Sequence, residues 1–200
     1  MTETEKMLAG VLYDPSADGL PTLRAKAHTL CQRYNGIPET DGTERERILS
    51  ELLPNLGKNV YLQGPIQFDY GRFTTIGDGS FANFNFTVLD CAPVQIGKNV
   101  FFGPNVSIYT PVHPLRWQER NCYMKEDGTV TDAEYARPVT IGDNCWIAGG
   151  VTICGGITIG SGTVIGAGSV VTRDIPAGVF AVGNPCHALR PITDEDRMPG

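Results

Sequence analysis

The chain has little positive charge and no long apolar run. It contains 16 Lys and Arg against 22 Asp and Glu, which gives a net charge of −6 at pH 7. Because phosphate binding depends on clustered Lys and Arg, this balance argues against nucleic acid as the main partner. No apolar run approaches the roughly 18 residues of a membrane-spanning helix, and the polar segment 1–6 does not resemble a secretory signal. We therefore expect a cytoplasmic protein without a membrane partner.

Metal-binding patterns are also missing. None of the six cysteines belongs to a C-x-x-C pair or to a Cys/His cluster at zinc spacing. They are expected to be reduced thiols, with Cys145 and Cys154 at positions where a small buried side chain fits. The G-x-S-x-G, phosphate-loop and H-E-x-x-H motifs are absent as well. We expect no metal, while the hydrophobic content of 41% is enough for a packed core.

What the chain does contain is an aliphatic or other apolar residue at every sixth position. The clearest run is Ile141, Ile147, Ile153, Ile159, Ile165 and Val171. An earlier run consists of Ile76, Ala82 and Val88 and, after a two-residue shift, Ile96, Phe102 and Ile108. A short fixed period is the signature of a parallel β-helix, in which about 18 residues form one triangular coil. The two runs predict an all-β fold of about four coils.

The N-terminal segment lacks this period and predicts helices instead. A short helix is expected over Thr2–Leu8, and a second from Pro21 to a C-cap at Asn35-Gly36. A third is expected to begin at Thr43, because Thr43 and Glu46 have the spacing of a capping box. Pro54 would end it.

These patterns divide the chain into three parts. We interpret 1–56 as a helical segment that caps the end of a β-helix, since terminal repeats need a cover. The β-helix domain is expected over 57–190, and 191–200 reads as a loose tail. Between the two runs of repeats lies a long excursion, 111–138. A loop of this length inside a compact domain is usually functional, so we expect a lid or binding arm.

The strongest candidate for chemistry lies where this excursion begins. His113 stands between Pro111 and Pro114, and the proline rings stiffen the backbone on either side of it. A rigid, partly exposed imidazole is a good general base, because its unperturbed pKa lies near working pH. The sequence has only two other histidines, His28 in the helical segment and His187 near the end of the repeats.

Several segments together resemble the hexapeptide-repeat acyltransferases, and most closely the maltose and galactoside O-acetyltransferases. The resemblance runs from about residue 5 to residue 190. The segments that carry it are Lys6–Tyr13, Phe68–Gly71, Phe81–Asn85, Thr110–Pro114, Pro138–Ile147 and Val170–Pro176.

The resemblance implies a left-handed parallel β-helix, a rare exception to the right-handed crossover rule. It also implies a homotrimer with acetyl-CoA and acceptor sites in the clefts between subunits. His113 would then take the proton from an acceptor sugar hydroxyl, which attacks the thioester carbonyl directly. Nearby hydrogen-bond donors would stabilise the oxyanion, and no covalent acyl-enzyme is required because both substrates share one cleft.

The resemblance also implies the residues that contact each substrate. On the acceptor side these are Asp14, Asp69, Asn83 and either Asp90 or its neighbour Cys91, and we add Glu134 from the excursion. On the coenzyme A side they are Trp146, Gly149, Ala167, Thr172, His187 and Arg190. Gly149 replaces a serine of the galactoside enzymes and His187 replaces an arginine. Only a backbone contact could persist at Gly149, and Arg190 remains as the cationic contact.

Other functions remain open at this point. A xenobiotic or serine-type O-acetyltransferase would share the fold, but the N-terminal helical segment argues against it. A β-helix carbonic anhydrase needs three histidines at one zinc site, and His28, His113 and His187 are badly placed for that. A non-catalytic β-helix scaffold would explain the repeats, yet it leaves His113 and the long excursion without a role. The sequence does not name the acceptor, which could be maltose, glucose or a galactoside.

Overall fold

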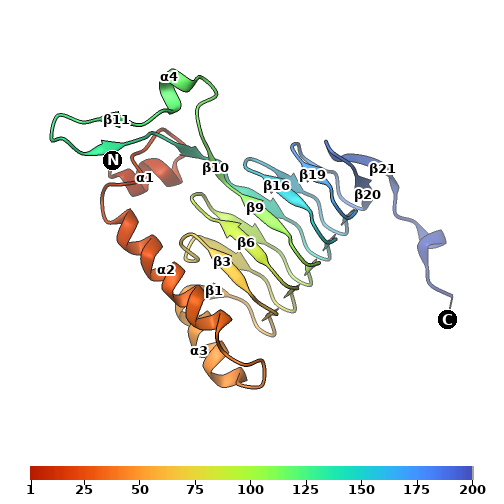
Figure 1. Cartoon of the computed structure of the whole chain (residues 1–200). Coiled ribbons are helices and arrows are strands. Elements are labelled where there is room, and N and C mark those ends of the chain that lie inside the picture. The colour runs from red at the N-terminus through yellow and green to blue at the C-terminus, as the bar shows by residue number, and fades with distance from the viewer. Residues whose placement is uncertain (200) are drawn as a thin grey trace.

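Short parallel strands stacked in three sheets form a triangular prism in the computed structural model, which describes residues 1–199 (Figure 1). The first sheet consists of β1 (Asn55–Leu56), β4 (Thr74–Ile76), β7 (Val94–Ile96), β14 (Val139–Ile141) and β17 (Thr158–Ile159). The second consists of β2 (Tyr61–Leu62), β5 (Phe81–Ala82), β8 (Phe101–Phe102), β15 (Trp146–Ile147), β18 (Val164–Ile165), β20 (Val179–Val182) and the antiparallel β21 (His187–Pro191). The third consists of β3 (Ile66–Phe68), β6 (Phe86–Leu89), β9 (Ser107–Tyr109), β16 (Thr152–Cys154) and β19 (Val170–Val171).

The predicted fold class is confirmed: the chain is a left-handed parallel β-helix of hexapeptide repeats. The predicted size of about four coils was too small. Five coils take one strand from each sheet, and β20 with the Ile159–Ile175 bridge begins a sixth. The coil missing from the count is the first one, whose inward-pointing residues Leu56, Leu62 and Phe68 also stand six residues apart.

The coils differ in length, and the difference explains the two-residue shift in the sequence. Leu56 pairs with Ile76 and Ile76 with Ile96, so the early coils take 20 residues each. Ile141 pairs with Ile159, so a later coil takes 18 residues. The extra residues lie at the corner that follows the third sheet. We call the prism edge formed by these corners the catalytic edge, because the chain departs there toward His113, which the sequence predicts to be the base.

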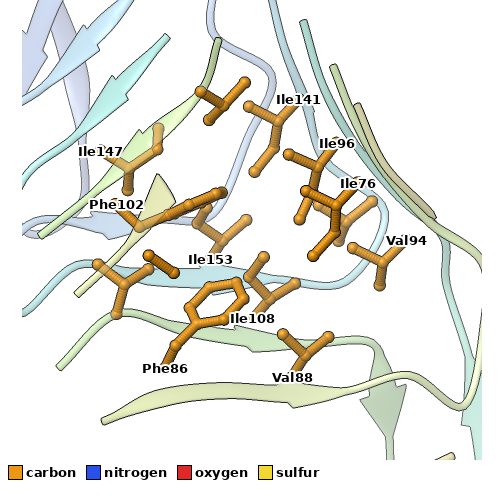
Figure 2. Close-up of a cluster of buried hydrophobic side chains, with 14 of the residues drawn as sticks. Ile76, Phe86, Val88, Val94, Ile96, Phe102, Ile108, Ile141, Ile147 and Ile153 are labelled. Carbon is orange, nitrogen blue, oxygen red and sulfur yellow. The ribbon is translucent and has the colours of Figure 1, made fainter. Parts of the chain in front are cut away.

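The core is a column of aliphatic and aromatic side chains that point into the prism. Figure 2 shows side chains from successive coils gathered there, among them Ile76, Ile96 and Ile141. Their neighbours in sequence point outward, as in any strand, so each two- or three-residue strand contributes one or two buried residues. Burial of apolar surface stabilises a fold by about 25 cal/mol per Å². Because stacking buries these side chains between coils, it stabilises strands that are too short to be stable alone.

Two helices, α2 (Leu20–Asn35) and α3 (Gly42–Leu52), close one end of the prism (Figure 1). The short helix α1 (Glu3–Leu8) precedes them and packs against β13. Buried side chains of α2 and α3 belong to the same core cluster as the first coil, including Tyr34 and Leu52. The predicted capping box at Thr43 is wrong. Asp41 is the N-cap instead, and its side chain accepts a hydrogen bond of 3.2 Å from the Glu44 amide.

The excursion 111–138 is an ordered arm that projects from the prism near α1 (Figure 1). It holds β10 (Pro111–Val112), α4 (Trp117–Arg120), β11 (Tyr123–Met124), β12 (Val130–Thr131) and β13 (Tyr135–Ala136). β10 pairs with β13 and β11 pairs with β12, both antiparallel. A further bridge joins Tyr13 to Glu134, so the arm is fastened to the N-terminal segment. None of the helices within residues 1–199 has the length and apolarity to cross a bilayer.

Candidate active site

His113 lies at the base of the arm, between two carboxylates. β10 and β13 pair so that Val112 stands opposite Tyr135, which brings the returning strand beside the imidazole. His113 Nδ1 lies 3.7 Å from an Asp132 carboxylate oxygen, and Nε2 lies 3.7 Å from a Glu134 carboxylate oxygen. The His113 side chain is 47% exposed, whereas that of Glu134 is 13% exposed. The imidazole is therefore open to a substrate on one side and flanked by negative charge on the others.

Glu134 is held in place from behind by Tyr13. The Tyr13 hydroxyl donates a hydrogen bond to Glu134 Oε1, and the two backbones exchange hydrogen bonds of 3.0 and 3.3 Å. Burial raises the pKa of Glu134, while the Tyr13 hydrogen bond and the nearby His113 oppose this rise. Burial also raises the pKa of Tyr13, so its hydroxyl remains a donor. This arrangement fixes the carboxylate that faces the imidazole.

Asp69 and Cys91 meet at the catalytic edge. The Cys91 thiol donates to Asp69 Oδ2 at 3.6 Å, and Asp69 Oδ1 lies 3.4 Å from Nε2 of His28 on α2. Burial raises the pKa of the Cys91 thiol, which keeps it protonated. Tyr13 and Cys91 pack in one buried cluster, so Asp69 and the His113 assembly belong to the same site.

Asp90 does not face the acceptor side, and the prediction for it needs correction. Its side chain is fully buried. The carboxylate accepts hydrogen bonds of 2.8 to 3.2 Å from the backbone amides of Tyr70, Gly71 and Phe73 and from the Thr74 hydroxyl. Burial raises its pKa to about 6 against the opposing effect of these donors. Asp90 shapes the corner of the coil, and of the two alternatives Cys91 is the residue that contacts Asp69.

Asp14, predicted to contact the sugar, has side-chain and backbone partners of its own. Its carboxylate accepts hydrogen bonds from Lys125 and from the Thr131 hydroxyl on the arm, and also from the Ser16 amide. Burial alone would raise the pKa of Asp14, but these partners lower it overall. With a side chain only 13% exposed, Asp14 fastens the arm to the N-terminal segment.

Three other predicted residues lie on a different edge of the prism. Asn83 follows β5, while Gly149 and Ala167 follow β15 and β18, so all three lie between the second and third sheets. Backbone hydrogen bonds from Gly150 to Pro104 and from Gly168 to Gly149 align these corners along one edge. We call this the cofactor edge. Within one chain the third sheet separates it from His113, so a single chain does not bring Asn83 and His113 together.

The remaining predicted cofactor residues lie on the second sheet or directly after the last strand of the third sheet. Trp146 is 54% exposed on the outer face of β15, and the exposed Thr172 follows β19 at the catalytic edge. His187 and Arg190 lie on β21. The Arg190 guanidinium makes two hydrogen bonds, 2.8 and 2.6 Å, to the Asp196 carboxylate, which holds the Asp196 pKa at about 2. The segment 191–200, predicted to be a loose tail, thus contacts the sheet through Asp196.

The outer face of the second sheet is aromatic, a feature that the sequence reasoning missed. It carries Tyr61, Phe81, Phe101 and Trp146 at successive register positions. Tyr61 and Phe81 stack with centroids 6.1 Å apart, and Phe81 meets Phe101 edge-on at 6.5 Å. The equivalent positions of the third sheet are polar: Gln67, Thr87, Ser107 and Thr152. The signal was present in the sequence, because each of these aromatic residues stands directly before an inward-pointing residue.

The cysteines and potential metal ligands add no second site. All six cysteines are free thiols; four are buried as predicted, while Cys122 is exposed and Cys154 is half-buried. In the part of the chain that the structure describes, no group of three or more His, Cys, Asp or Glu side chains could hold a metal ion.

Profiles of known families match both the N-terminal helical segment and the repeats. The family profile of the maltose acetyltransferase hexapeptide capping motif matches residues 6–57. The bacterial transferase hexapeptide profile matches 138–173, and the hexapeptide repeat of succinyl-transferase matches 93–113.

Similar proteins span the whole chain. A putative acetyltransferase of Saccharomyces cerevisiae is 43% identical, with 96% of this chain and 94% of the relative covered. The galactoside O-acetyltransferase of Escherichia coli is 38% identical, with 98% and 93% covered. Among solved structures, a maltose O-acetyltransferase from Clostridium difficile has a TM-score of 0.88 at 43% identity, covering 97% of this chain and 99% of that one. A galactoside acetyltransferase in complex with coenzyme A has a TM-score of 0.90 at 38% identity, covering 98% and 94%.

The structural role of Asp90 can be distinguished from the side-chain contacts of Asp69 by the effect of each residue on stability. Asp90→Ala leaves three backbone amides without an acceptor in a buried corner, and we expect it to lower the free energy of unfolding by about 2–4 kcal/mol. Asp69→Ala removes contacts to side chains only, and we expect a loss of about 1 kcal/mol or less. Denaturant unfolding at one fixed protein concentration measures both variants. Equal losses would contradict the structural role of Asp90.

Proposed function

The chain belongs to the maltose and galactoside O-acetyltransferase family of hexapeptide-repeat acyltransferases, and on this premise we propose that it transfers an acetyl group from acetyl-CoA to a sugar hydroxyl. The observation that carries the proposal is the placement of His113. Its imidazole is half-exposed, flanked by Asp132 and Glu134, and joined through the Tyr13–Cys91 cluster to Asp69. The Asp69 carboxylate can accept hydrogen bonds from hydroxyl groups, and His113 on the same edge can deprotonate an alcohol held there.

The proposed reaction is a direct transfer. His113 takes the proton of the acceptor hydroxyl as its oxygen forms a bond to the thioester carbonyl carbon. The tetrahedral oxyanion then collapses, the carbon–sulfur bond breaks, and the thiolate of coenzyme A receives the proton from the imidazolium. The negative charges of Glu134 and Asp132, each 3.7 Å from a ring nitrogen, stabilise that imidazolium between the two steps. General base catalysis of this kind contributes about 10²–10⁴-fold to the rate.

The residues on the second sheet and the cofactor edge fit a coenzyme A thioester. The exposed indole of Trp146 offers an apolar surface to the pantetheine, and Gly149 offers only its backbone. Arg190 and His187 are exposed on β21, where a guanidinium and an imidazole suit phosphate groups. Ala167 and Thr172 complete the proposed set. Bound acetyl-CoA would supply the activated acetyl group, and these residues would hold it in place.

A second copy of the chain would complete the site. Asn83 and His113 lie on different edges of one prism, so a cleft containing both needs two chains. Tyr61 and Phe101 on the aromatic face are exposed apolar side chains that a neighbouring copy would cover. We propose a homotrimer, because three such contacts between two different edges close a ring. Each cleft would combine the catalytic edge of one chain with the cofactor edge of the next.

Removal of the base tests the mechanism. We expect His113→Ala to reduce kcat for acetyl transfer by about 10²–10⁴-fold, because the variant loses the proposed general base. Thiol release from acetyl-CoA across maltose, glucose and a galactoside measures the rate. Calorimetric binding of coenzyme A should be unchanged. Arg116→Ala in the same arm, which loses only the exposed pair with Glu119, is the control. Unchanged turnover in His113→Ala would remove His113 from the mechanism.

The ion pair of Arg190 predicts an effect on cofactor affinity. The Asp196 carboxylate is paired with the Arg190 guanidinium, which we assign to a phosphate of coenzyme A. The phosphate must therefore compete with Asp196 for Arg190. We expect Asp196→Asn to tighten coenzyme A binding severalfold. Asp194→Asn removes the same charge from the same turn without a contact to Arg190, and should change affinity less. Equal affinities for the two variants, measured by calorimetry at low salt, would contradict the assignment of Arg190.

A further inference from the structure

His28 on helix α2 reaches into the acceptor side of the site. Its Nε2 lies 3.4 Å from Asp69 Oδ1, and its side chain is 47% exposed. Asp69 belongs to the corner that follows β3, so α2 and the first coil meet at this contact. The N-terminal segment therefore does more than cover the end of the prism, because it supplies an imidazole to the catalytic edge.

The Asp69 carboxylate is held on both of its oxygens. His28 contacts Oδ1, and the buried Cys91 thiol donates to Oδ2 at 3.6 Å. The Asp69 side chain is only 18% exposed, so its orientation is defined by these two neighbours. Each carboxylate oxygen has a second lone pair, which leaves the group free to accept two further hydrogen bonds. Two neighbouring hydroxyl groups of a sugar match that pair of acceptors.

The charges around Asp69 restrict the kind of acceptor. Glu134 and Asp132 lie on the arm beside His113, and both add negative charge to the same side of the site. The Arg24 guanidinium is the cation that offsets part of this charge near Asp69, and it also donates to the Tyr70 hydroxyl at 3.3 Å. Carboxylates accept hydrogen bonds from hydroxyl groups and repel phosphate or carboxylate groups. This surrounding favours a neutral acceptor.

We propose that His28 is a positioning residue of the acceptor site: its ring N–H donates to Asp69 and fixes the carboxylate that receives two neighbouring hydroxyl groups of a neutral sugar. The inference rests on the proposed sugar O-acetyltransferase function. Helix α2 thereby takes part in acceptor recognition, and it takes no part in the binding of acetyl-CoA. His28 acts through Asp69 and does not itself touch the reacting atoms.

Steady-state kinetics with the neutral sugar that the wild type acetylates best provides the test. His28→Ala should raise the KM for the sugar about tenfold, the usual effect of one hydrogen bond to a charged group. The KM for acetyl-CoA and the kcat at saturating sugar should not change. His28→Gln retains a side-chain N–H donor and should recover part of the loss. Gln32→Ala, one turn further along the exposed face of α2, should behave as wild type.

A double variant separates positioning from direct binding. If His28 acts through Asp69, then His28→Ala in an Asp69→Ala background should raise the KM for the sugar no further. A further rise in that background, or a KM unaltered in His28→Ala alone, would overturn the proposal while the sugar acetyltransferase activity stands. Turnover of glucose 6-phosphate as efficient as that of glucose would overturn the preference for a neutral acceptor. Failure of the wild type to acetylate any sugar would overturn the proposed function, and this inference with it.

Discussion

The structure depends on the continuous stacking of inward-pointing side chains from one coil to the next. Ile76, Ile96 and Ile141 occupy equivalent positions in successive coils, and no insertion within a strand could be accommodated without breaking that column. Extra residues can therefore enter only at the corners. They do so after the third sheet, where the early coils take 20 residues and where the arm departs. The same constraint that keeps the core regular thus gathers Asp69, Cys91 and His113 along one edge.

The arm and the helical segment support each other around this edge. Asp14 binds Lys125 and Thr131 on the arm, while Tyr13 binds Glu134 beside His113. Neither element has a large core of its own, so their mutual contacts set the position of the carboxylate that faces His113. This explains why a segment that caps the far end of the prism also shapes the site. It further explains why the scaffold interpretation is the weaker one, since it gives these aligned polar groups no role.

Regular features were predictable from the sequence, and features that depend on tertiary contacts were not. The six-residue period identified the β-helix, and its interruption located His113, because both are local properties of the chain. The structural roles of Asp90 and Asp14 depend on which backbone amides and side chains fold around each carboxylate. Asp132 and His28 could not be found because the register of the arm and the packing of α2 bring them to the site. The early capping box failed for a similar reason, since Asp41 competes with Thr43 for the same helix end.

In the proposed trimer each site combines the catalytic edge of one chain with the cofactor edge of another, and a mixture of two impaired variants shows whether it does. His113→Ala and Asn83→Ala should each be strongly impaired alone. When the two are co-expressed with different tags and purified together, about a quarter of the clefts in randomly assorted trimers receive both wild-type residues. Acetyl transfer should then return to about that fraction of the wild-type rate. Activity no higher than that of the separate variants would contradict it.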